Sequence, residues 1–124
     1  MKHTKKIFIA DDDDDILSIL AMMLKTKGYN ITASVNANTV FDQQGDLPDL
    51  ILLDIWMSGI DGRDICNRLK SDPVMKDIPV IFISANSRLE EIATSCKASD
   101  YISKPFEMDH LLKRIEANLK LTQE

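Results

Sequence analysis

The chain has 124 residues, of which 44% are hydrophobic and 28% are charged, and these values are typical of one globular domain with a real core. Fifteen basic and twenty acidic residues give a net charge of −5, which argues against a nucleic-acid-binding domain because such domains present a basic face. The length also argues against a large enzyme.

Two kinds of apolar pattern alternate along the chain. Short apolar runs without polar alternation predict strands that are buried on both faces, as in a parallel sheet. Apolar residues three and four apart predict helices. In chain order, the sequence predicts strand 7–10, a helix from residue 16 that ends at Gly28, strand 29–33, helix 36–44, strand 50–53, helix 63–70, strand 80–83, helix 88–96, strand 101–102 and helix 108–119.

This alternation of strands and helices determines the predicted fold class. Strands that alternate with helices imply right-handed crossovers and a parallel sheet. We therefore predict an α/β fold, a doubly wound five-stranded parallel sheet with helices on both faces. The acidic run 13–15 lies where the first helix begins, and we expect it to be solvated and to cap that helix.

The number of cysteines and the hydropathy of the chain indicate the cellular compartment. Cys66 and Cys96 are too few for a disulfide framework and form no CxxC motif, so we expect both to be reduced and partly buried in helices. The apolar run 7–10 behind the basic amino terminus is too short for a signal peptide. No stretch approaches the ~20 apolar residues of a membrane span. We therefore expect a cytoplasmic protein.

Most of the side chains that could bind a ligand or take part in catalysis follow the carboxyl ends of the predicted strands. Asp11 and Asp12 end the first strand, Asp54 ends the third, Ser84 ends the fourth, and the fifth leads into Lys104. Ligands of a doubly wound sheet bind at this edge, so we expect these side chains to converge.

Three carboxylates in such a group repel one another unless a cation neutralises them. A hard divalent ion with oxygen ligands fits, and Mg²⁺ is favoured because water molecules can complete its octahedron. The hydroxyl of Ser84 and the ammonium of Lys104 suit a phosphoryl group beside that ion. With Asp54 as the nucleophile, the product is an aspartyl phosphate.

Five segments, in this order and at these intervals, resemble the receiver domain of two-component response regulators, including the chemotaxis regulators. They are IFIADD (7–12), PDLILLD (48–54), GIDG (59–62), IPVIFISA (78–85) and YISKPF (101–106). Each segment alone is a weak signal, but together they are specific. The resemblance implies that residues 1–124 form one receiver domain with the flavodoxin-like strand order 2-1-3-4-5.

The resemblance also implies roles for individual residues. Asp54 would accept a phosphoryl group from the phosphohistidine of a histidine kinase or of a histidine phosphotransfer protein. Mg²⁺, or Mn²⁺ in its place, would be held beside Asp54 by Asp12, by Asp11 partly through water, and by the main-chain carbonyl of Trp56. Lys104 would pair with a phosphoryl oxygen, and the bond from Lys104 to the following proline would be cis.

The same resemblance implies a switch. Ser84 would move to hydrogen-bond the phosphoryl group, and Tyr101 would follow it inward. Phosphorylation adds charge and acceptor oxygens, and side chains with two positions form a bistable element that it can bias. The output surface would be the last helix–strand–helix face, at residues 88–96, Tyr101 and 108–119, and would bind a partner that the sequence does not name.

We expect a signalling domain that phosphorylates and dephosphorylates itself and is not a turnover enzyme. It would be a monomer or a phosphorylation-dependent dimer, with no direct contact to nucleic acid or membrane. Because the chain ends after the fifth predicted helix, we expect it to stand alone or to pass phosphate on in a relay.

Three features depart from the family's pattern. Ser58 stands where the family usually has Pro, and Lys97 stands where it often has a helix-ending Gly. The segment 84–104 is about two residues shorter than is common, which shortens the fourth predicted helix. The bulky Trp56 leads us to hypothesise that its ring shields an acyl phosphate at Asp54 from water.

Two alternatives remain open from the residues. A phosphohydrolase of the haloacid-dehalogenase type also uses an aspartate, a hydroxyl, a lysine and Mg²⁺, and residues 11–13 could pass for its DxD motif. The position of Ser84 after the fourth strand and the lack of room for a cap domain argue against it. The second alternative is a docking module with the same fold that works without phosphorylation.

Overall fold

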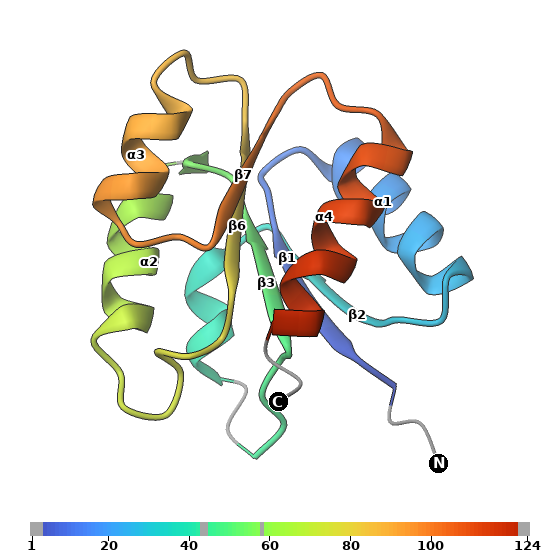
Figure 1. The fold of residues 1–124 in the computed structure, drawn as a ribbon, viewed down its shortest axis with the longest axis horizontal. Helices are drawn as coiled ribbons and strands as arrows, with labels where there is room; N and C mark the ends of the chain where they lie inside the picture. The colour runs from blue at the N-terminus through green and yellow to red at the C-terminus, as the bar shows by residue number, and fades with distance from the viewer. Residues whose placement is uncertain (1–3, 43–44, 58, 122–124) are drawn as a thin grey trace.

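The computed structural model describes residues 4–42, 45–57 and 59–121. A five-stranded parallel sheet forms its centre, with the strand order β2-β1-β3-β6-β7 (Figure 1). These strands are β1 (Lys6–Ala10), β2 (Asn30–Ser34), β3 (Leu50–Leu53), β6 (Val80–Ser84) and β7 (Asp100–Ser103). Since β6 and β7 are the fourth and fifth strands of this sheet along the chain, the predicted order 2-1-3-4-5 is confirmed.

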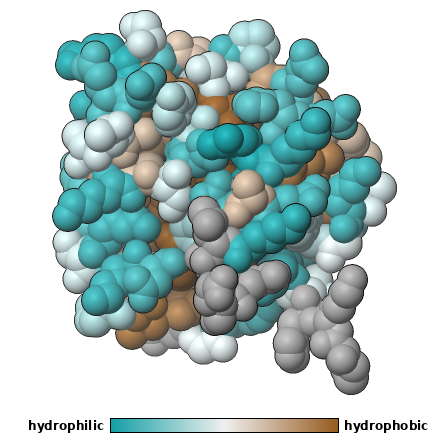
Figure 2. Space-filling view, in the orientation of Figure 1, coloured by the Kyte–Doolittle hydropathy of each residue, from teal (hydrophilic) through white to brown (hydrophobic). Residues whose placement is uncertain are grey.

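Helices cover both faces of the sheet (Figure 1). Two helices, α1 (Asp14–Thr26) and α4 (Met108–Leu121), pack on one face. The other face carries the 3₁₀ helix η1 (Ala37–Asp42), α2 (Gly62–Lys70) and α3 (Leu89–Ser95). Hydrophilic side chains dominate the surface in the same orientation, and apolar ones show between them (Figure 2).

Burial on both faces explains the solid apolar runs. Successive side chains of a strand point to opposite faces. In β1, Ile7 and Ile9 therefore join the core under α1 and α4, whereas Phe8 and Ala10 join the core under α2 and α3. All four residues of β3 are at most 1% exposed for the same reason.

The two ends of α1 follow the predicted signals. The carboxylate of Asp13 accepts hydrogen bonds from the N–H groups of Asp15 (3.0 Å) and Ile16 (3.3 Å), so Asp13 caps the helix. Gly28 follows the helix with φ +95°, and its N–H donates to the carbonyl of Lys25 (2.9 Å). The N–H of Tyr29 donates to Leu24 (3.2 Å), which completes a Schellman motif.

Two local predictions were wrong. The predicted helix 36–44 is a shorter 3₁₀ helix, η1, and residues 43–44 lie outside the described residues. The predicted loop after Asp54 contains two short antiparallel strands, β4 (Trp56–Met57) and β5 (Ile60–Asp61). Strands of two residues are too short to show any periodicity. The departure at Ser58 lies outside the described residues.

Both cysteines are free, as predicted, and buried more completely than expected. The thiol of Cys66 in α2 donates to the carbonyl of Cys96 at the end of α3 (3.3 Å). Burial raises the pKa of the Cys66 thiol to about 11. Among the described residues, no helix is both long and apolar enough to cross a membrane.

A polar network ties β7 to α4. Asp100 is 7% exposed and accepts hydrogen bonds from Nε of Arg114 (2.6 Å) and from the amide of Asn118 (3.1 Å). Burial alone raises the pKa of Asp100, but these bonds and the bond from the N–H of Tyr101 outweigh burial and lower the pKa below 3.8. The folded protein therefore favours the ionised carboxyl.

We expect the contribution of Asp100 to stability to be complete above about pH 4 and to be lost as the pH falls through its depressed pKa. The variant Asp100→Asn should be less stable than the wild type at pH 7, and this difference should shrink at pH 3. Urea unfolding at both pH values measures it. An equal difference at both pH values would contradict the prediction.

Candidate functional site

Three carboxylates meet at the carboxyl ends of β1 and β3. Asp11 and Asp12 follow β1, Asp54 follows β3, and one oxygen of each lies within 4.8 Å of the others. These acids meet because Ala10 and Leu53, the last residues of the two strands, are paired neighbours. The N–H of Asp54 continues this pairing by donating to the carbonyl of Ala10 (3.1 Å). The structure thus brings the predicted acids together.

The ammonium of Lys104 bridges two of these acids. Its Nζ donates to Oδ2 of Asp11 (2.9 Å) and to Oδ2 of Asp54 (3.1 Å). The backbone aims the side chain, because the N–H of Lys104 donates to the carbonyl of Ser84 (2.9 Å) and so extends the pairing of β7 with β6. The bond from Lys104 to Pro105 is cis, as the resemblance implied.

Burial and charge act in opposite directions here. Burial raises the pKa of Asp11, and the hydrogen bonds from Lys104 and from the N–H of Asp13 offset only part of that rise. Burial by itself lowers the pKa of Lys104, but its bonds and attraction to Asp11 and Asp54 outweigh burial and raise that pKa. The lysine therefore stays charged at neutral pH.

The donor set fits a hard divalent cation. By formal charge, three carboxylates and one ammonium add up to −2, which a divalent ion would neutralise. All the side-chain donors are carboxylate oxygens, the ligands that Mg²⁺ prefers. Asp12 is exposed, so one side of the cluster is open to a small ion and its water.

The two predicted switch residues lie on neighbouring strands. Ser84, at the end of β6, is 6% exposed, and its Oγ accepts a hydrogen bond from the N–H of Asn86 (3.2 Å). Tyr101 on β7 is 38% exposed. A hydrogen bond to Glu90 of α3, with burial adding to it, raises the pKa of Tyr101. The segment that leads into α3 thus holds Ser84, and Glu90 of α3 is the main cause of the raised pKa of Tyr101.

The short hairpin β4–β5 begins at Trp56, two residues after Asp54. Trp56 pairs with Asp61 and is 61% exposed, so its ring lies at the surface two residues after Asp54. Oδ1 of Asp54 accepts a hydrogen bond from the N–H of Ile55 (2.7 Å). The second carboxylate oxygen is the one that faces Lys104.

Gly62 lets α2 approach the backbone at Asp54. Its N–H donates to the carbonyl of Ile55, and a Cβ at this position would lie 2.2 Å from the carbonyl oxygen of Asp54. Only glycine fits such a contact. Sequence reasoning included Gly62 in a motif but missed this role, because nothing local in GIDG shows which backbone lies opposite.

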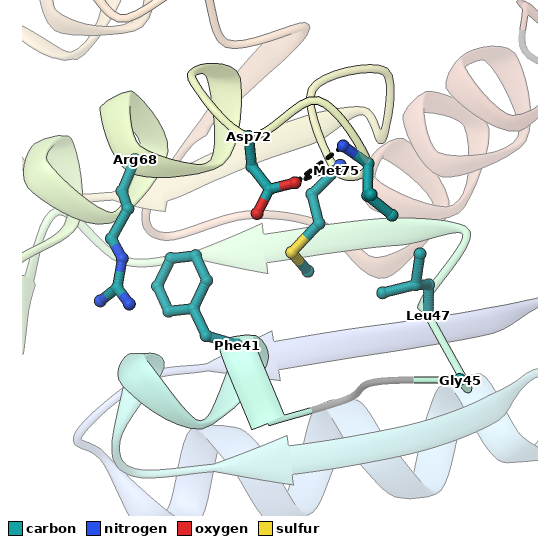
Figure 3. A pocket seen from close by; sticks show the side chains of 7 residues that line it. Phe41, Gly45, Leu47, Arg68, Asp72 and Met75 are labelled. Carbon is teal, nitrogen blue, oxygen red and sulfur yellow. Dashed lines mark hydrogen bonds between the residues drawn. The ribbon is translucent and has the colours of Figure 1, made fainter.

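A cavity of about 420 Å³ lies elsewhere, between η1, the end of α2 and the loop before β6 (Figure 3). The guanidinium of Arg68 stacks over the ring of Phe41, 3.8 Å from its centre, and Leu47 and Met75 add apolar walls. Several residues that line the cavity lie just before β3 and β6, so the cavity is at the amino ends of these strands. The acids, in contrast, follow the carboxyl ends of β1 and β3. It is therefore separate from the acidic cluster.

Comparison with known proteins assigns the family. A model of the response regulator receiver domain matches residues 7–116. The chain belongs to this family. It is also 38% identical over 120 residues to the nisin biosynthesis regulatory protein NisR of Lactococcus lactis subsp. lactis, covering 93% of this chain and 50% of that protein. The receiver domain thus spans about half the length of this curated relative.

Solved structures agree with this assignment. The receiver domain is similar to a putative response regulator from Chloroflexus aurantiacus J-10-fl (28% identity, TM-score 0.87), covering 95% of this chain and 99% of that one. It is also similar to the signal receiver domain of a signal transduction histidine kinase from Syntrophus aciditrophicus (27% identity, TM-score 0.88), covering 98% of this chain and 94% of that one. As a receiver domain, the protein is a signalling domain of two-component systems.

We expect Gly62→Ala to lower the free energy of unfolding by about 1–3 kcal/mol, because the added methyl group must push α2 away from the carbonyl of Asp54. Urea unfolding measures the loss. The exposed Asp64 in the same turn of α2 provides a control, since Asp64→Ala should change the stability much less. A stability of Gly62→Ala equal to the wild type would show that the contact is not tight.

Proposed function

We propose that this receiver domain accepts a phosphoryl group on Asp54. The supporting observation is the bridge from Lys104 to both Asp11 and Asp54, which holds a cation where charge develops on a transferring phosphoryl group. An oxygen of Asp54 attacks phosphorus, the N–P bond of the donor phosphohistidine breaks, and its electron pair stays on the imidazole nitrogen. The acyl phosphate then keeps Lys104 as a partner for a phosphoryl oxygen.

We propose that the acidic cluster binds Mg²⁺, with Mn²⁺ as a substitute. Asp12, Asp54, Asp11 partly through water, and the main-chain carbonyl of Trp56 would hold it. When bound, the ion offsets the negative charge of the acids and of the phosphoryl oxygens. The chain's own contribution is the fixed position of Asp11, whose Oδ1 accepts the N–H of Asp13 (3.0 Å) while Oδ2 accepts Lys104.

We further propose that Ser84 and Tyr101 read the phosphoryl group. The hydroxyl of Ser84 would leave the N–H of Asn86 to bond a phosphoryl oxygen, and Tyr101 would turn inward from Glu90. The output face is then formed by α3, β7 and α4. Its partner is another protein, and the phosphodonor is a histidine kinase or a histidine phosphotransfer protein.

The bounds of the domain, its oligomeric state and its location in the cell stay predictions. We propose that residues 1–124 form one receiver domain, since the family match covers residues 7–116. The resemblance also supports a domain that is not a turnover enzyme, that is a monomer or a phosphorylation-dependent dimer, and that lies in the cytoplasm.

We expect Asp54 to be phosphorylated by acetyl phosphate in the presence of Mg²⁺, and we expect Asp54→Asn or removal of Mg²⁺ to abolish the modification. Intact mass spectrometry detects the added phosphoryl group. Asp64→Asn, an exposed acid outside the cluster, is the control and should be modified like the wild type. Uptake by Asp54→Asn would refute the assignment.

The same material separates the two alternatives. Sustained hydrolysis of para-nitrophenyl phosphate would favour a phosphohydrolase of the haloacid-dehalogenase type, against which the family match already argues. No modification of the wild type by acetyl phosphate would favour a docking module that works without phosphorylation.

We expect Trp56→Ala to lose its phosphoryl group severalfold faster than the wild type, because we hypothesise that the exposed indole, two residues after Asp54, limits the approach of water to the acyl phosphate. The decay of the phosphorylated species after removal of acetyl phosphate measures the rate. Trp56→Phe keeps a large ring and should decay at nearly the wild-type rate. Equal rates for all three proteins would discard the shielding hypothesis.

A further inference from the structure

Two helices of this protein end in the same motif but with different residues. After α1, Gly28 has φ +95° and bonds back to Lys25, and the next N–H bonds to Leu24. After α3, Lys97 has φ +59°, its N–H bonds to Thr94 (3.2 Å), and the N–H of Ala98 bonds to Ala93 (2.9 Å). Within the described residues, Lys97 is the one non-glycine residue with positive φ.

A lysine in this position is strained where a glycine is not. In the left-handed region the Cβ of an L-residue lies too close to its own following carbonyl oxygen, whereas glycine has no Cβ. Such strain persists only where the surroundings hold it in place. Here the two backbone bonds and the packing of Ala98 against the core hold it.

The helix that Lys97 ends is weakly anchored. It has seven residues, and Arg88 at its start makes no capping hydrogen bond with its side chain. The buried residues that anchor it to the core are Leu89, Ala93 and the following Cys96, and two of these three side chains are small. A short helix with little buried apolar area opens at low free energy.

Both ends of this segment connect to the proposed switch. Before α3, Oγ of Ser84 accepts the N–H of Asn86, and Oδ1 of Asn86 accepts the N–H of Arg88 (2.8 Å). After α3, the chain enters β7, which packs against α3 and carries Tyr101. A turn of Ser84 toward a phosphoryl group therefore removes a bond at the start of the segment whose other end carries the strain.

We propose that backbone strain at Lys97 shifts the equilibrium of this switch toward the phosphorylated state. The left-handed backbone of Lys97 is held in the resting state and relaxes when the domain is phosphorylated. Lys97 thereby lowers the free energy needed to rearrange α3 and the chain that leads into β7. The inference rests on the proposed phosphorylation of Asp54 but concerns a residue outside the acidic cluster.

The test compares the affinity of backbone variants for beryllofluoride, a stable mimic of the phosphoryl group, in the presence of Mg²⁺. Lys97→Gly removes the strain from the resting state, so it should unfold at a higher temperature and bind beryllofluoride about fivefold more weakly, a difference of about 1 kcal/mol. Lys97→Ala keeps the Cβ and should bind like the wild type. Gly28→Ala adds strain at the end of α1, so it should unfold at a lower temperature without any change in affinity.

Hydrogen exchange provides a second readout. In the wild type, saturating beryllofluoride should speed the exchange of the Lys97 and Ala98 amides, because their bonds to Thr94 and Ala93 open. Unchanged exchange, or equal affinities of Lys97→Gly and the wild type, would overturn the inference. Equal weakening by glycine and alanine would also overturn it, because the effect would then come from the lysine side chain. A wild type that does not bind beryllofluoride would contradict the proposed function itself.

Discussion

The contact of one ammonium with two carboxylates is the feature of the site that depends on the order of the whole sheet. Lys104 follows β7, whereas Asp11 follows β1, and the strands β6 and β3 lie between them at spacings of about 4.8 Å. The contact therefore forms only when the sheet has this order and when the backbone of Lys104 is directed inward by its bond to Ser84. Because the acids repel one another, the fold must supply this arrangement from elsewhere, and two buried cores on either side of the sheet do so.

The sequence predicted those parts of the structure whose cause is local or periodic. Solid apolar runs revealed the strands because both faces of the sheet are covered, and the acids after residues 10 and 53 revealed the site because parallel strands bring their carboxyl ends to one edge. The sequence failed where the cause is a distant partner. Nothing near Trp56 indicates its pairing with Asp61, nothing near Gly62 indicates the carbonyl of Asp54, and the length of η1 depends on packing against α2 and β1.

The ends of α1 and α3 form the same helix-ending motif, but the sequence predicted only the first of them. Gly28 was readable as a helix end because glycine adopts positive φ without strain. Lysine gives no such signal, and the helix end at Lys97 was indicated only because the family often has a glycine at this position. The structure shows that the backbone kept the glycine conformation although the residue changed. A departure from a family's pattern can therefore leave the geometry intact and change its energy.

Favourable and unfavourable features are distributed unevenly over the molecule. The turn at Gly28 and the ion pair of Asp100 with Arg114 stabilise elements away from the acidic cluster. Clustered carboxylates, an Asp11 whose pKa is raised by burial, and a left-handed lysine lie at the site or at the segment next to it. Under the proposed function, a cation and a phosphoryl group would relieve these unfavourable interactions, and a switch between two states of similar stability requires such a release of free energy.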